Sequence, residues 1–240
     1  MASTYSTNAQ LEIITTGEKA GQWGGINNTN LQILEQTSTG VLDVDISAAS
    51  STLVLTDGAT STGKNVYFRL YGTLAANRTI TMPGTAERVL IMKDDTVRGT
   101  SNYTVGVLTA SGTTQPIPPG ATVLCKSNGS ETVVTLLEKG YETITDANSP
   151  YTAVAGAQIL ANTTSTVITV TLPAAASTGD EITIIDARGT WGSNNLTVDR
   201  NGLKINSGTS NLTLSNNGQS ITLVYVDATR GWAYKTNYTS

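Results

Sequence analysis

From Val41 onward, hydrophobic and polar residues alternate along the chain. Leu42, Val44 and Ile46, for example, are each followed by a polar residue. A period of two places every second side chain on the same face of an extended strand, so this pattern predicts a strand with one buried and one wet face. Similar short segments follow at spacings of about 8 to 12 residues with Gly, Asn and Ser between them, which is typical of β-sandwiches and barrels. We therefore predict an all-β protein.

The alternating part of the chain contains an internal repeat. Thr79–Pro83 followed by Val89–Asp94 has a counterpart in Thr169–Pro173 followed by Ile182–Asp186. Two further pairs of similar segments are Ser101–Val105 with Ser193–Val198, and Gly120–Cys125 with Gly218–Leu223. A period of about 90 to 100 residues exceeds the roughly 50 residues of a solenoid unit. The repeat thus predicts two tandem β-sandwich-like domains, at residues 41–140 and 141–240, in line with a length of 240 residues.

Residues 1–40 lack the alternating strand pattern, and their sequence predicts a short N-terminal helical segment. Gly21, Gly24 and Gly25 surround Trp23 and indicate a tight turn, after which Asn28 is expected to cap a helix. The apolar side chains of that helix are Leu31, Ile33 and Leu34, and Gly40 is expected to end it.

So short a helix with so narrow an apolar stripe is marginal alone in water and needs a surface to pack on. One interpretation is a helical cap on the first β domain, with Trp23 pinning one end. The other is a docking or oligomerisation segment that becomes stable only against other subunits.

Composition narrows the possible partners. Charged residues make up 13% of the chain, against about 25% in an average protein, and Thr, Ser, Asn and Gly take their place. A net charge of -4 and the lack of a Lys/Arg cluster argue against nucleic acid as a partner. No apolar run approaches the length of a membrane span, and Met1–Ser6 lacks the features of a secretory signal. Cys125, as the one cysteine, is expected to be a small core residue.

The residues needed for common catalytic and metal sites are scarce. With no His and one Cys, zinc sites and Ser-His-Asp or Cys-His arrangements have no ligands or bases, so we predict no catalytic residue, metal or cofactor. Gly58–Lys64 has the spacing of a phosphate-binding loop, but Asn65 stands where Ser or Thr is needed and Val66–Tyr71 predicts a strand instead of a helix. This stretch is better explained as a hairpin turn.

Carboxylates are the remaining side chains that could form a catalytic or metal site. Asp43 and Asp45 share one face of a predicted strand, and a glycosidase needs two carboxylates around a sugar groove. Unpaired carboxylates on the wet side of an edge strand are more often a solubilising device. A calcium site at Asp94–Asp95 or Asp180–Glu181 is a further alternative, although no EF-hand spacing is present.

Aromatic residues are few, and three tyrosines fall in or near predicted turns. Tyr103, Tyr151 and Tyr238 could form an outward surface that binds a sugar or a protein partner. The simpler interpretation is that they shield the ends of the two cores.

Two segments resemble a known family. Leu11–Gln36 resembles the N-terminal segment of tail-fibre-like structural proteins of tailed bacteriophages, particularly marine ones. The matching positions are Gly21, Trp23-Gly24, Asn27-Asn28 and Leu31–Glu35. Leu74–Pro83 is similar to the strand motif that follows in those proteins. The resemblance covers about residues 8 to 140 and thins over the second domain.

The resemblance implies a non-enzymatic virion component that is commonly trimeric and lies in the tail or on the head surface. We expect attachment to the virion, or closure of a homotrimer, through Trp23, Asn28, Leu31, Ile33 and Leu34. The expected partners are further copies of the chain, other virion proteins and a host surface glycan. A capsid decoration protein, a carbohydrate-binding adhesin and a polysaccharide depolymerase using Asp43 or Asp45 are the alternatives.

Overall fold

The computed structural model describes residues 3–98 and 102–238, which are mostly β-strand with one α-helix, α1 (Trp23–Thr39). The chain divides into two compact units. Unit 1 consists of the described residues of Met1–Val97, Val105–Ile117 and Thr122–Leu137. Unit 2 consists of those of Arg98–Thr104, Pro118–Ala121 and Glu138–Ser240. Each unit is described by itself.

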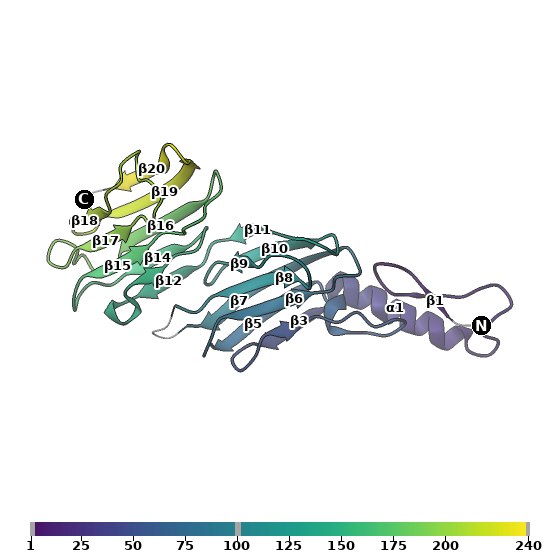
Figure 1. Ribbon diagram of the computed structural model, residues 1–240. Coiled ribbons are helices and arrows are strands. Elements are labelled where there is room, and N and C mark those ends of the chain that lie inside the picture. The colour runs from purple at the N-terminus through teal and green to yellow at the C-terminus, as the bar shows by residue number, and fades with distance from the viewer. Residues whose placement is uncertain (1–2, 99–101, 239–240) are drawn as a thin grey trace. The chain divides into compact units, whose positions relative to one another are not determined.

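Unit 1 contains two facing sheets (Figure 1). Sheet 1A has the strand order β3-β5-β7-β10-β11 and sheet 1B the order β4-β6-β8-β9. The strands are β3 (Val41–Asp45), β4 (Ser51–Thr52), β5 (Tyr67–Thr73), β6 (Arg78–Met82), β7 (Arg88–Val97), β8 (Val105–Thr109), β9 (Gln115–Ile117), β10 (Thr122–Ser127) and β11 (Thr132–Glu138). A short two-stranded hairpin, β1 (Thr4–Tyr5) and β2 (Glu12–Ile13), precedes α1, and a 3₁₀ turn, η1 (Thr62–Lys64), precedes β5.

The path of the chain through these sheets is that of a β-solenoid. Successive strands from β3 to β8 alternate between sheets 1A and 1B, so the chain coils, and each strand pairs in parallel with the strand one coil later. Tyr67 of β5, for example, pairs with Ile91 of β7, 24 residues further along. Strands β9 and β10 then add to the two sheets in antiparallel orientation.

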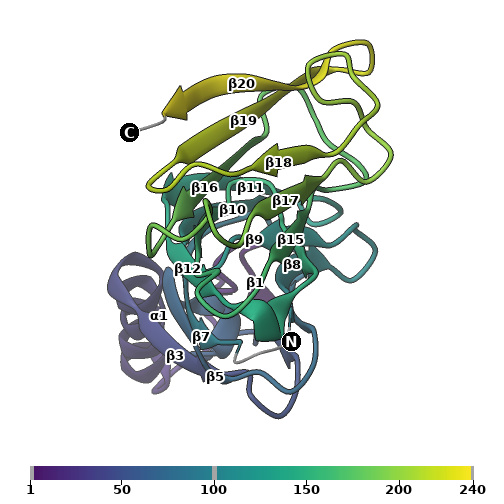
Figure 2. The same ribbon diagram turned by 90° about the vertical axis from the view of Figure 1, so that its left-hand side faces the viewer.

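Unit 2 repeats this topology. Sheet 2A has the order β12-β14-β16-β19-β20 and sheet 2B the order β13-β15-β17-β18, with parallel pairing up to β17 and antiparallel pairing afterwards. Figure 2 shows both sets of strands from another side. The elements are β12 (Tyr141–Ile144), the 3₁₀ turn η2 (Asp146–Asn148), β13 (Tyr151–Thr152), β14 (Gln158–Ala161), β15 (Ile168–Thr171), β16 (Glu181–Asp186), β17 (Leu196–Asp199), β18 (Leu212–Leu214), β19 (Ser220–Asp227) and β20 (Gly231–Tyr238).

The similar sequence segments occupy equivalent strands of the two units. The pairs are β6 with β15, β7 with β16, β8 with β17, and β10 with β19. Ser101, where one of the similar segments begins, lies outside the described residues. The repeat in the sequence therefore corresponds to a repeat of nine strands in the same order.

The expectation of two β-sandwiches is wrong, whereas an all-β chain with a short N-terminal helix is correct. Strands of a two-sheet solenoid alternate inward and outward just as sandwich strands do, so the period of two could not separate parallel coils from antiparallel hairpins. The coil repeat is short and uneven: Ser51 pairs with Ile80, 29 residues later, but Tyr141 pairs with Gln158, only 17 later. That irregularity hid the true solenoid period in the sequence.

Both cores lie between the paired sheets. In unit 1, Phe68, Met92 and Val123 are fully buried and occupy one register line across β5, β7 and β10. In unit 2, Ile159, Ile184 and Ile221 do the same across β14, β16 and β19. Trp232 of β20 is also buried and meets the Tyr225 ring edge-on, at 5.6 Å between centroids.

Strand β9 contains Pro116, which lacks the N–H that a central strand needs, and β9 is the edge strand of sheet 1B. The hairpin predicted at Gly58–Lys64 is wrong, because this loop connects β4 of sheet 1B to β5 of sheet 1A. Among the described residues, no helix has the length and apolar character needed to span a membrane.

Candidate attachment site at the N-terminal helix

Helix α1 begins earlier than the sequence predicts. Trp23, Gly24 and Gly25 form its first turn and do not form a separate tight turn. Asn28 lies inside the helix, so the prediction that it caps the helix is wrong. The N-cap is Gln22, whose side chain makes no capping hydrogen bond. Gly40 follows the last helical residue as predicted and donates its N–H to the carbonyl of Gln36.

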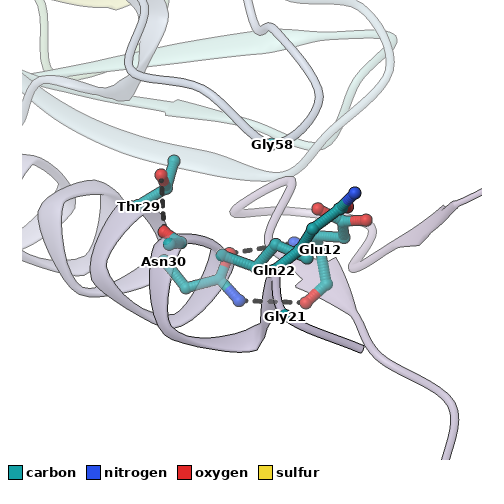
Figure 3. A pocket seen from close by; sticks show the side chains of 8 residues that line it. Glu12, Gly21, Gln22, Thr29, Asn30 and Gly58 are labelled. Atoms are coloured by element: carbon teal, nitrogen blue, oxygen red, sulfur yellow. Dashed lines mark hydrogen bonds between the residues drawn. The ribbon is translucent and has the colours of Figure 1, made fainter. Parts of the chain in front are cut away.

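One face of α1 is fastened to the β1–β2 hairpin by an asparagine. The side-chain amide of Asn30 donates to the Glu12 carbonyl at 2.9 Å, and its oxygen accepts the Glu12 N–H at 3.0 Å (Figure 3). The amide thus binds the backbone of β2 as a neighbouring strand would. The N–H and the carbonyl of Glu12 are both satisfied in this way.

A glutamine makes the same kind of contact six residues later. The Gln36 side chain accepts the Ser61 N–H at 3.2 Å and donates to the Ser61 carbonyl at 3.1 Å. Ser61 directly precedes η1 of unit 1. Between the two amides lies Ile33, the one fully buried residue among the 17 of α1. The inner face of the helix is therefore held by two polar clamps and a single apolar side chain.

The hairpin itself is closed by an ion pair. The Glu12 carboxylate accepts a hydrogen bond from the Ser3 hydroxyl at 2.7 Å and lies 2.9 Å from the Lys19 ammonium. The Ser3 hydrogen bond and then the Lys19 hydrogen bond lower the pKa of Glu12. These contacts order the hairpin in front of the helix N-terminus.

A groove of about 390 Å³ lies between this hairpin and the start of α1 (Figure 3). It is lined by Glu12, Gly21, Gln22, Gly25, Ile26, Thr29, Asn30 and Gly58. Gly58 closes one side because its N–H donates to the Gln10 carbonyl, and a Cβ added to it would lie 2.9 Å from the Tyr5 ring. The lining has few apolar side chains and no cluster of ionisable groups, so its chemistry suits a polar chain segment better than a reaction.

Three large apolar side chains of α1 are exposed. Trp23, Leu31 and Leu34 have exposed fractions of 63%, 55% and 44%. On a helical wheel these three side chains lie within about 80° of one another and flank the clamped face, because Asn30 lies about 20° from Trp23 and Ile33 about 80° from it. We call Trp23, Leu31 and Leu34 the outer stripe. Trp23 does not pin α1 to unit 1, contrary to the cap interpretation.

The arrangement is unusual for a helix that packs only on its own domain. Such helices normally direct their apolar side chains toward the core and their polar side chains toward water. Here amide side chains contact the domain, while three of the large apolar side chains face solvent.

The loop that resembled a phosphate-binding loop encloses its own lysine. The Lys64 ammonium donates to the carbonyls of Thr56 and Ala59 at 2.7 and 2.6 Å, and the side chain is fully buried. Burial lowers the pKa of Lys64. The cation that would hold a phosphate instead ties residues 56–64 into a compact turn.

The carboxylates considered for chemistry have protein partners. Asp43 lies 3.6 Å from Arg69, and Asp45 accepts the Ser47 N–H at 2.9 Å, which is the main reason its pKa is lowered. Asp95 also pairs with Arg69, at 2.6 Å. The expectation that Asp43 is unpaired is therefore wrong.

The carboxylates suggested as calcium ligands have protein partners too. Asp94 is buried and accepts hydrogen bonds from Thr96. Asp180 accepts the Ser177 N–H, and Glu181 pairs with Lys139 and Lys235. Among the described residues, no three His, Cys, Asp or Glu side chains come together as metal ligands would.

The three tyrosines have different environments. Tyr238, in the last strand, is 67% exposed, and Tyr103 is half-buried. Tyr151 is buried in the core of unit 2, where its hydroxyl donates to Glu142 and burial raises its pKa. The Tyr151 ring therefore cannot make the outward contact suggested for it. Cys125 is buried as expected, which raises the pKa of its thiol to about 12.

Sequence reasoning missed Asn30 and Gln36. Both are ordinary surface residues by type, and only their positions three residues before and three residues after the buried Ile33 place them on either side of the helix face that contacts the domain.

Comparison with known proteins gives little guidance. No family model matches the chain, and a search of curated proteins finds no match. One similar solved structure is described as "Structure of a chaperone-substrate complex", with 12% identity, a TM-score of 0.36 and 82% of this chain covered. The chain spans about a third of that protein's length, since the match covers 32% of it. A likeness of that extent carries no argument about fold or function.

Proposed function

We propose that this protein is a structural component of a bacteriophage virion, a tail fibre or tail-associated protein that assembles as a homotrimer. In this proposal residues 1–40 attach the protein to the particle, and unit 2 faces the host or solvent. The protein performs no catalysis, and its partners are further copies of itself and other virion proteins.

The outer stripe is the observation that carries the proposal. An isolated helix shorter than about 12 to 15 residues is marginal in water, and one of 17 is only slightly longer. Three exposed apolar side chains on it cost free energy unless another molecule covers them. A helix that is clamped to its domain by amides and presents its apolar side outward is suited to docking.

The strand surfaces also support a structural role. Charged residues form only 13% of the chain, so subunits can be pressed together with few unpaired charges to bury. The carboxylates nearest to one another are held in ion pairs or turn hydrogen bonds. A building block needs such surfaces, whereas a depolymerase needs free carboxylates around a substrate.

The test is incorporation into particles. Virus is produced in host cells that supply either the wild-type protein or the double variant Leu31→Gln/Leu34→Gln, and the protein in purified virions is measured by mass spectrometry. We expect at least a tenfold loss of the variant from particles, with little change in its melting temperature.

Val167→Thr is the matched control, because Val167 is 55% exposed and belongs to unit 2, whereas α1 belongs to unit 1. Absence of the wild-type protein from virions would reject the proposal. Normal incorporation of the double variant would show that α1 does not mediate attachment. Cryo-microscopy of the particle then separates a tail position from the alternative of a capsid decoration protein.

A further inference from the structure

The outward face of sheet 1A carries more exposed apolar side chains than a solvated sheet needs. Six large apolar residues that are exposed by more than a third lie on it. They are Val41 on β3, Tyr71 on β5, Val89 and Val97 on β7, and Val133 and Leu137 on β11. Each alternates along its strand with a more buried neighbour, so all six point away from the core of unit 1.

One register line across this face is apolar from strand to strand. Val41 pairs with Tyr67, Tyr67 with Ile91, and Ile91 with Leu124. Neighbouring strands are about 4.8 Å apart, so the four side chains form a continuous ridge about 15 Å long. Val89 lies two residues from Ile91 on the same face of β7 and widens this ridge.

Unit 2 provides an internal comparison, because it has the same topology. The equivalent line there pairs Tyr141 with Gln158, Gln158 with Thr183 and Thr183 with Thr222, so polar residues replace Tyr67, Ile91 and Leu124 while an aromatic residue replaces Val41. The two threonine hydroxyls are 3.0 Å apart and hydrogen-bond to each other. Thr183 corresponds to Ile91 and Thr222 to Leu124 in both the sequence repeat and the strand pairing. The fold therefore forms with polar residues at these positions. The apolar character of Ile91 and Leu124 is not required by the fold itself.

Three of the charges beside the ridge are already paired with one another. Arg69 lies between Asp43 and Asp95, and its guanidinium carbon is 5.8 Å from the centre of the Tyr71 ring. Breaking a buried ion pair is costly, but a pair that stays complete when it is covered avoids that cost. The face also carries Lys93 and Lys126, so both signs of charge are present on it.

We infer that the outward face of sheet 1A, centred on Tyr67, Ile91 and Leu124, is the contact between copies of this chain. A surface that carries both charge signs beside an apolar ridge can meet copies of itself around a symmetry axis without net repulsion between like charges. A partner whose charges are mostly of one sign would instead be repelled by the residues of that same sign on this face. The inference rests on the proposed function, because it assigns the subunit contact to sheet 1A and leaves the outer stripe of α1 for attachment.

The experiment transplants the unit 2 residues into unit 1. Ile91→Thr/Leu124→Thr copies Thr183 and Thr222, and mass is measured by light scattering over a hundredfold range of protein concentration. We expect the wild-type chain to have a multiple of 25.0 kDa. The double variant is expected to dissociate to monomer at concentrations at least tenfold higher than the wild type does.

Two further variants keep the result decisive. Val89→Thr/Val133→Thr alters positions that are more than half exposed, so it weakens the contact without disturbing the core, and it decides the matter if the first variant misfolds. Val167→Thr in unit 2 should leave the mass unchanged. A wild-type monomer at all concentrations, or folded sheet 1A variants with wild-type mass, would overturn the inference.

Failure of this inference is distinguishable from failure of the proposed function. Virion incorporation tests the proposed function and does not depend on which surface joins the subunits. A protein that enters virions but keeps its mass in both sheet 1A variants would refute the inference alone.

Discussion

Gln36 and Ser61 exchange two hydrogen bonds, with the glutamine amide taking the place of a strand beside the serine backbone. The two residues are 25 positions apart in the sequence and join α1 to the loop before β5 of unit 1. Together with the contact between Asn30 and Glu12, this pair decides which side of α1 faces the domain.

Gln36→Ala should loosen the helix without unfolding unit 1. It removes two partly buried hydrogen bonds of about 0.5 to 1.5 kcal/mol each, so local opening of α1 should become about 1 to 3 kcal/mol easier. Hydrogen exchange of the amides in Trp23–Thr39 is the measurement. Gln32→Ala, on an exposed position of the same helix, should leave exchange unchanged. Equal exchange in the two variants would mean that the clamp contributes nothing.

Asp186→Asn should destabilise unit 2 in a pH-dependent way. The buried carboxylate accepts the N–H groups of Arg188, Thr190, Trp191 and Gly218. Burial alone would raise the pKa of Asp186, but the four hydrogen bonds outweigh it and the pKa is lowered.

Because the folded-state pKa is depressed, the stabilisation is complete above the unfolded pKa of about 3.9 and is lost as pH falls below that value. The variant should therefore lose about 1 to 3 kcal/mol of unfolding free energy at pH 7 and a smaller amount near pH 3. Denaturant unfolding at both pH values measures this. A difference between wild type and variant that does not change with pH would contradict the explanation.

Cys125 should report on opening of unit 1. Its thiol is fully buried, and burial raises its pKa to about 12, so little reactive thiolate exists at pH 8. Labelling by iodoacetamide should be slow in the native protein and fast in denaturant. Fluorescence of Trp191 and Trp232, both buried in unit 2, follows the other unit. Rapid native labelling would show that the unit 1 core is open to solvent.

Alanine substitutions at two glycines with positive φ distinguish the cost of steric crowding from the cost of backbone strain. Gly231 has φ +71°, and an added Cβ would lie 1.9 Å from the Lys204 carbonyl oxygen. Gly179 has φ +95° with nothing within 4 Å of that position. Gly179→Ala should cost about 1 to 2 kcal/mol of unfolding free energy, from strain alone. Gly231→Ala should cost about 3 kcal/mol or more, and equal losses in thermal or denaturant unfolding would show that the backbone at Gly231 relaxes freely.

The sequence predicted the strands and the helix better than it predicted their arrangement. Alternation found the strand around Val44, and the match of Asp94 with Asp186 found the repeat, because both depend on spacing within the chain. Parallel pairing depends on which strands meet in space, and it leaves the same alternation as antiparallel pairing. The sandwich prediction failed for that reason.

The candidate site was predicted only in its apolar part. Leu31 and Leu34 were recognisable from their type and spacing as residues in need of a partner. The sequence did not show whether these leucines face the domain or solvent. The orientation of the helix is fixed by two side-chain amides, Asn30 and Gln36, which bind the backbone of segments distant in the sequence. Asn28 was chosen as a cap by residue type, but the helix begins six residues earlier than that choice requires, with Gln22 as its N-cap and Gly24 and Gly25 in its first turn.

The nine-strand order of unit 1 has a consequence for biosynthesis. Its parallel pairs join residues less than 30 positions apart, and nearly all of its residues precede Glu138. A ribosome therefore releases the first coiled body before most of the second has been made, and domains that emerge first generally fold first. Early folding of the nascent chain would keep the two copies of one topology from exchanging strands, a hazard that similar neighbouring sequences otherwise face.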